Sequence, residues 1–133
     1  LSAGPIHFAH AGWASVDISD ESEPSADAMV DPLAMDVIGP MVEGLDAPRR
    51  VRAEAVLDRW AEDDDVWLRR AVVLSPLRAL RKGGGDWDRF ARRAKILLEQ
   101  SRNAGAEGEV VREAVALVLA EVAKTRPEMQ LPP

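Results

Sequence analysis

The chain of 133 residues contains no cysteine, which excludes disulfide bonds and metal sites built on thiolates. Tyrosine is also absent, and no segment alternates apolar and polar residues as a half-buried strand does. No apolar run reaches the roughly 18 residues of a membrane span, and the N-terminus lacks the basic start and apolar core of a signal peptide. We therefore expect a soluble, cytoplasmic, helical protein that does not associate with membranes.

Histidine is scarce as well. His7 and His10 are the only two, and their i, i+3 spacing would suit a metal ion on a helix. No third ligand is evident near them in the sequence. We therefore treat the pair as a chance spacing and expect neither a metal site nor a cofactor.

Charge is unevenly distributed along the chain. The formal net charge of -6 and the pI near 4.9 do not by themselves indicate nucleic-acid binding. Residues 17–65 hold fifteen acidic residues against four arginines, whereas residues 69–95 hold nine basic residues against two acidic ones. The second stretch, called the basic block below, would give one face of the protein a positive potential unless its side chains are simply solvated.

Helical patterns begin near residue 31. Residues 1–30 are rich in Gly, Pro, Ser and acids without a sustained period, which predicts an irregular segment. Asp31 is predicted to cap a helix with Pro32 at its first position, and Gly39-Pro40 should bend or cut that helix short. We expect residues 31–128 to form one helical domain, followed by a tail at residues 129–133.

The later helices follow from apolar spacing and from caps. One begins near Pro48, and the residues expected on its buried side are Val51, Ala55, Val56 and Leu57. Asp64 or Asp65 can cap the next helix, which Pro76 should kink or split. The glycines at 83–85 form a break, after which Asp86 can cap a further helix. A last apolar helix stops before Pro127.

This pattern predicts an all-α fold with at least four helices in antiparallel succession between residues 31 and 126. Short loops favour antiparallel helix pairs stacked as an α-solenoid, or else an irregular bundle. The positions on the apolar stripes predict a core that includes Trp60, Val72, Leu74, Leu97, Val115 and Leu119.

The stretch DDDVWLRRAVVLS at residues 63–75 is unusual because two adjacent arginines precede an apolar run. Neighbouring residues lie about 100° apart on a helix, so Arg69 and Arg70 cannot both lie on the buried face. Either the pair belongs to a solvated helix edge, or it forms an anion site, because a guanidinium donates forked hydrogen bonds to a phosphate or a carboxylate. We expect Arg70 to lie within about 5 Å of Asp31 or an anion. Arg69 should pair with an acid such as Glu62 or Asp65, or face solvent.

Two segments of the sequence resemble the DNA alkylation repair enzymes, which are HEAT-like-repeat alkylpurine DNA glycosylases. The first is RWAEDDDVWLRRAVVLS and the second is VVREAVALVLAEVAKTRPE. The matched residues are Trp60, Trp67, Arg69, Arg70, Ala71, Arg112, Ala114, Leu119, Glu121, Ala123, Lys124, Thr125, Pro127 and Glu128. The resemblance covers about residues 28–128 and implies part of a HEAT-like solenoid.

The family carries a catalytic carboxylate at the end of a Trp-Asp-x-Val-Asp segment, and two positions here are similar to it. Asp17 follows a tryptophan in WASVD, whereas Asp31 precedes an apolar, glycine-containing helix. We favour Asp31, because Asp17 would require a long insertion. The resemblance then implies that Asp31 and Arg70 are catalytic residues, and that Trp67, Arg69, Arg112 and Lys124 contact double-stranded DNA.

The sequence also departs from the family pattern. Leu117 stands where the family has a tryptophan, Ala120 replaces an arginine, and Asp27 is found four residues before Asp31 where another tryptophan is expected. Two hypotheses follow. The protein is a DNA glycosylase that excises cationic N3- or N7-alkylated purines, or it is a non-catalytic helical module that binds DNA or a protein.

Overall fold

The computed structural model describes residues 26–132, and every regular element among them is a helix. In chain order the elements are α1 (Ala26–Leu33), the π-helical turn η3 (Ala34–Ile38), α2 (Gly39–Glu43), α3 (Ala47–Ala61), α4 (Val66–Leu74), α5 (Leu77–Arg81), α6 (Trp87–Ser101) and α7 (Gly105–Ala123). The all-α prediction is confirmed. None of these helices combines the length and the apolar character that a membrane span requires.

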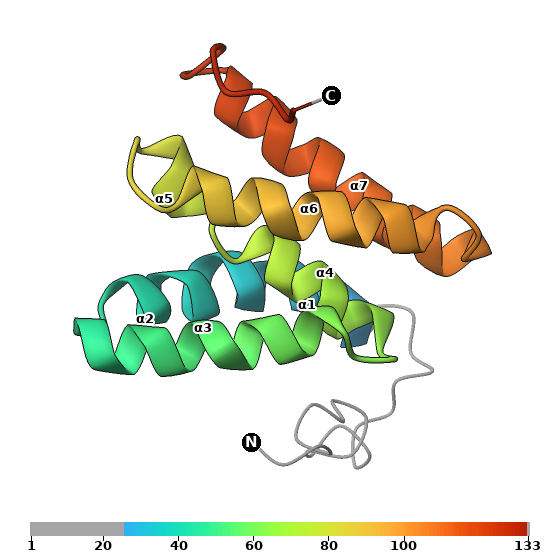
Figure 1. Cartoon of the computed structure of the whole chain (residues 1–133), viewed down its shortest axis with the longest axis horizontal. Coiled ribbons are helices and arrows are strands. Elements are labelled where there is room, and N and C mark those ends of the chain that lie inside the picture. Colours follow the sequence, from blue (N-terminus) through green and yellow to red (C-terminus); the bar gives the residue numbers. More distant parts are fainter. Residues whose placement is uncertain (1–25, 133) are drawn as a thin grey trace.

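The helices run back and forth in two layers (Figure 1). The run from α1 to α2 is antiparallel to α3, the run from α4 to α5 is antiparallel to α6, and α7 returns across α6. Helix α4 lies between α1 and α7. Helix α3 packs against α2 and α4, and α6 packs against α4 and α7. The predicted antiparallel succession is therefore confirmed. It places α4 at the centre, with residues of α1 and α7 on either side of it.

The start of the helical part differs from the prediction. Helix α1 begins at Ala26, so Asp31 lies inside this helix and does not cap a helix beginning at Pro32. Pro32 is likewise inside α1, where it removes one backbone donor. The side chain of Asp31 is therefore free to interact with another helix.

Gly39-Pro40 does not cut the first helical run. The chain continues from α1 into α2 through η3, in which the N–H of Gly39 donates to the carbonyl of Ala34, five residues earlier. A π-helical turn widens the helix just before Pro40, where a regular turn would press the proline ring against a carbonyl. Gly39 itself packs against the end of α4, because a Cβ at this position would lie 2.0 Å from the carbonyl oxygen of Ser75.

The other boundaries follow the predicted caps and breaks. The carboxylate of Asp65 accepts the N–H of Trp67 at the start of α4, and Asp86 accepts the N–H of Arg89 at the start of α6. Helix α4 ends at Leu74, and Pro76 separates it from α5. Gly83 and Gly85 have positive φ values of 91° and 73°, which suit glycine and break the chain before α6.

Most of the predicted core is buried. Val72, Leu74, Leu97 and Val115 are buried, whereas Trp60 and Leu119 are half-buried. The prediction for α3 was wrong at two positions, since Val51 is 69% exposed and Ala55 is also exposed. Val51 and Leu57 are six residues apart, about 240° around the helix, so burying Leu57 turns Val51 towards solvent.

The close contact at Gly39 generates a stability prediction. Gly39→Ala should lower the free energy of unfolding by about 1–3 kcal/mol, because the added methyl group overpacks the contact with the Ser75 carbonyl. Denaturation with urea would measure this loss. The matched control is Gly84→Ala, where the nearest atom to the new Cβ is 3.6 Å away, and we expect a change below about 0.5 kcal/mol. Equal stability of the two variants would contradict the importance of this contact.

Candidate functional site

The centre of the candidate site is an ion pair between helices α1 and α4. Arg70 Nε donates to Asp31 Oδ1 at 2.7 Å, and Arg70 Nη2 donates to Asp31 Oδ2, also at 2.7 Å. This is the forked arrangement in which the planar guanidinium and carboxylate groups match best. Arg70 is only 5% exposed, so the pair is largely removed from water on the arginine side. The expectation that Arg70 lies within about 5 Å of Asp31 is confirmed.

Helix α7 supplies the remaining partners of Arg70. Its Nη1 donates to the carbonyl of Val110 at 2.9 Å and to Glu113 Oε1 at 3.1 Å. Four of the five N–H groups of the guanidinium therefore have acceptors. Arg70 thus links three helices from separate parts of the sequence.

This environment keeps Arg70 charged. Hydrogen bonding to Asp31 raises the pKa of Arg70 above its usual value, and hydrogen bonding to Glu113 acts in the same direction. Burial opposes this effect because it disfavours the charged guanidinium, but the carboxylates outweigh it. Arg70 is therefore a cation at every physiological pH, and it holds a negative partner beside it.

An open pocket adjoins the pair. Its volume is about 290 Å³, and it is lined by Ala28, Asp31, Trp67, Arg70, Glu109, Val110 and Glu113. Three acidic residues, one arginine and Trp67 are among its lining residues. Asp31 and Glu113 bind the guanidinium of Arg70, whereas Glu109 pairs with Arg112. The excess of negative charge suits a cationic ligand better than a free anion.

Arg69 points away from this pocket, as the helical geometry requires. It donates to the backbone carbonyl of Asp63 and forms an ion pair with Glu107 at 3.3 Å. Arg69 pairs with an acid as expected, but this acid is Glu107 and not one of the two named examples, Glu62 and Asp65. Asp65 is occupied as the cap of α4, and Arg69 reaches instead to α7.

The two predicted DNA contacts on α7 have other partners. Arg112 donates to the carbonyl of Ser101 at 2.8 Å and pairs with Glu109 at 3.0 Å, which ties the end of α6 to the start of α7. Lys124 pairs with Glu121, one turn earlier. Neither side chain lines the pocket beside Asp31. Of the six predicted site residues, the structure brings together Asp31, Trp67 and Arg70.

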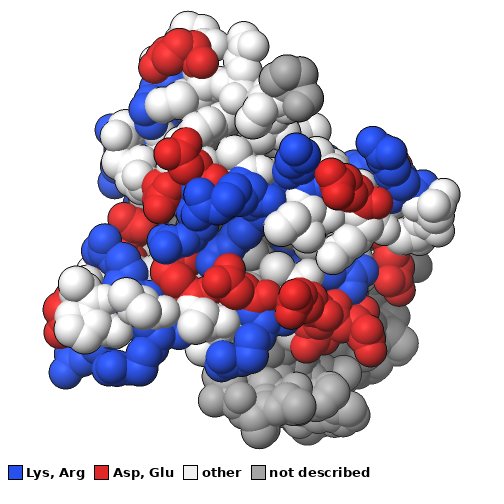
Figure 2. Space-filling view, viewed as in Figure 1, with Lys and Arg blue, Asp and Glu red and all other residues white. Residues whose placement is uncertain are grey.

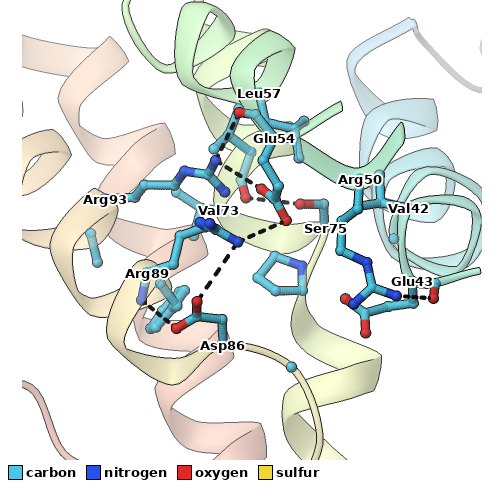
Figure 3. A pocket seen from close by; sticks show the side chains of 16 residues that line it. Val42, Glu43, Arg50, Glu54, Leu57, Val73, Ser75, Asp86, Arg89 and Arg93 are labelled. Atoms are coloured by element: carbon cyan, nitrogen blue, oxygen red, sulfur yellow. Dashed lines mark hydrogen bonds and ion pairs between the residues drawn. The ribbon is translucent and has the colours of Figure 1, made fainter. Parts of the chain in front are cut away.

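The basic block is largely neutralised by acids from other helices. Arg93 donates to Glu54 at 2.9 Å and to Asp58 at 2.8 Å, and Arg89 lies 3.4 Å from Glu54. Figure 3 shows Glu54 held between these two arginines, in a cavity of about 200 Å³. On the face in view in Figure 2, basic and acidic side chains are interleaved.

Only three members of the basic block form no ion pair within residues 26–132, namely Lys82, Arg92 and Lys95. If this block binds phosphate, it would do so through a few free cations or after acids are displaced.

Glu113 and Glu109 are site residues that the sequence did not single out. Glu113 lies directly after Arg112 in the second matched segment and four residues before Leu117, hence on the same side of the helix as Leu117. That spacing is the signal that could have identified Glu113.

Asp17, the other candidate carboxylate, and the histidines His7 and His10 lie outside the described residues. Within residues 26–132, no three His, Cys, Asp or Glu side chains are grouped to hold a metal ion.

Comparison with protein families gives one match. The model of a family described as DNA alkylation repair enzyme matches residues 23–131 of the chain. Comparisons with curated proteins and with solved structures give no match.

The ion pair between Asp31 and Arg70 predicts that substitutions at two aspartates of the first helical run differ in their effect on the stability of the protein. Asp31→Asn should lower the free energy of unfolding by about 2–4 kcal/mol, because Arg70 loses the charge that compensates its burial. Asp36→Asn is the matched control, since Asp36 pairs with Arg78 at the surface at 3.4 Å. We expect it to cost about 0–1 kcal/mol.

Urea denaturation at neutral pH measures both losses. Similar effects of the two substitutions would show that the Asp31–Arg70 pair does not have the stabilising role described here.

Proposed function

Because the chain belongs to the DNA alkylation repair enzyme family, we propose that it is a DNA glycosylase that releases cationic N3- or N7-alkylated purines from double-stranded DNA. The observation that carries this proposal is the position of the Asp31 carboxylate. Both of its oxygens accept hydrogen bonds from Arg70. Asp31 also lines an open pocket whose lining residues carry a net negative charge.

The chemistry of the lesion fits such a pocket. An N3- or N7-alkylated purine carries a positive charge, which makes it a good leaving group. As the bond from C1′ to the purine nitrogen breaks, its electron pair moves to the base, and the positive charge moves to the sugar. A fixed carboxylate stabilises this developing charge without having to reorganise. Asp31, Glu109 and Glu113 are the acidic residues that line the pocket in which such a charge would lie.

Each residue of the pocket has a proposed role in this reaction. Asp31 stabilises the sugar cation and orients the water whose oxygen then bonds to C1′, with the released proton passing to the carboxylate or to solvent. Arg70 acts as a positioning residue, because its hydrogen bonds fix the orientation of the carboxylate. The indole of Trp67 offers an apolar face for the deoxyribose.

A second candidate function is favoured by the missing aromatic walls. Leu117 and Asp27 stand where the resemblance to the family leads us to expect tryptophan. A site without those walls would hold the sugar less firmly. The chain would then be a helical module that binds DNA, or a protein partner, without excising a base.

Base excision distinguishes the two candidates. The wild-type chain should release alkylated purine from methylated duplex DNA, and Asp31→Asn should slow single-turnover release by about 10²–10³-fold, as removal of a main electrostatic stabiliser does. The assay temperature should lie well below the unfolding midpoint of the variant, since the same substitution destabilises the fold. Asp36→Asn, which keeps the pocket intact, should react at the wild-type rate. Duplex binding without any release by the wild-type chain would favour the non-catalytic candidate.

Salt dependence provides a test of DNA binding itself. If the free cations of the basic block contact phosphates, the affinity for undamaged duplex should fall as salt rises, with a log–log slope of about -0.9 per phosphate contact. Three contacts, through Lys82, Arg92 and Lys95, would give a slope of about -2.7. Titration of a fluorescent duplex at several salt concentrations measures this slope. Absence of binding at low salt would overturn both DNA-directed candidates.

A further inference from the structure

Glu113 differs from the other partners of Arg70 in its exposure. The Asp31 side chain is 29% exposed, and Val110 accepts through its backbone carbonyl. The Glu113 side chain, in contrast, is 73% exposed. An ion pair with so exposed a partner contributes little to stability, because water screens it and the long side chain loses freedom. Glu113 can therefore leave Arg70 without disturbing the rest of the site.

We propose that Glu113 occupies the position at Arg70 Nη1 that a phosphate of the DNA backbone takes, and that it thereby controls whether the site accepts DNA. This inference rests on the proposed function. Both groups present anionic oxygens, and a guanidinium binds phosphate with the same geometry as carboxylate.

The geometry around Arg70 allows this exchange. Asp31 binds the edge of the guanidinium formed by Nε and Nη2, whereas Glu113 binds at Nη1. A phosphate that replaces Glu113 therefore does not compete with Asp31. The Nη1 atom keeps its second hydrogen bond to the carbonyl of Val110, so the guanidinium stays in place during the exchange.

Glu113 also acts against DNA while it remains at Arg70. Its carboxylate lies 3.1 Å from Nη1 and lines the pocket with Asp31 and Glu109, so an approaching phosphate meets negative charge first. Four of the five N–H groups of Arg70 have acceptors, so while Glu113 is bound a phosphate finds a single N–H, on Nη2, without a partner in residues 26–132. A forked contact between Arg70 and a phosphate thus requires Glu113 to leave.

The test compares two substitutions that remove the same charge. Glu113→Gln removes the competing carboxylate at Arg70, and Glu99→Gln removes an exposed carboxylate on α6 that forms no ion pair in the described part of the chain. Affinity for an undamaged duplex is measured by fluorescence anisotropy over a range of salt concentrations. Circular dichroism confirms that both variants fold as the wild type does.

Glu113→Gln should bind undamaged duplex about three- to tenfold more tightly than the wild type, since an anion no longer competes for Arg70. Its log–log salt slope should steepen by up to about 0.9, the amount expected for one phosphate contact that the wild type makes only when Glu113 has left Arg70. Glu99→Gln should change affinity by less than about twofold and leave the slope unchanged.

Equal behaviour of the two variants would overturn the role of Glu113 and leave the proposed glycosylase function standing, because base excision and its dependence on Asp31 are measured separately. If neither the wild type nor Glu113→Gln binds duplex at low salt, both the inference and the proposed function are wrong.

Discussion

The burial of one guanidinium is the constraint on which the rest of this structure depends. Removing a cation from water is costly, and the cost is offset only if its hydrogen bonds and its charge are both satisfied. Arg70 meets this condition through Asp31 on α1 and through Val110 and Glu113 on α7. Its partners are 39 to 43 residues away in the sequence, so the correct packing of three helices is needed before any of them can reach it. The hydrogen bonds of Arg70 therefore hold α1, α4 and α7 in one relative alignment.

The same requirement fixes the chemical properties of the site. A carboxylate held by two short bonds to a permanently charged arginine keeps one orientation, which electrostatic stabilisation of a developing cation needs. Structural and chemical demands on Asp31 thus coincide, and the ion pair would be present in a catalytic protein and in a binding module alike. The two proposed functions differ in the aromatic residues they need. Trp67 lines the pocket, whereas Leu117 stands where the resemblance to the family predicts a tryptophan.

Much of the fold could be predicted from interactions between residues that are close in the sequence. Asp65, Asp86 and Pro76 mark helix boundaries through interactions within a few residues, so their roles were predictable. Asp31 was assigned to the site through the family resemblance, but its position inside α1 was missed because a local Asp-Pro signal favoured a cap. Val51 was misplaced because the neighbours of α3 decide which side of that helix is buried. Glu113 could not be paired with Arg70 from spacing alone, since the contact depends on how α7 packs across α4.

The uneven charge along the sequence is explained by pairing between helices. Asp31, Asp36 and Glu54 belong to the acidic stretch, and they bind Arg70, Arg78 and Arg93 of the basic block. Charge that is segregated in the sequence thus becomes interleaved at the surface, which is why the block presents no unbroken basic face on the side shown in Figure 2. Arginine suits these contacts better than lysine, because its planar fork can satisfy a carboxylate and a carbonyl together, as Arg93 does with Glu54. A protein that uses its arginines in this way has few cations left for phosphates. Under the proposed function, its affinity for DNA would therefore depend on which internal acids can be displaced.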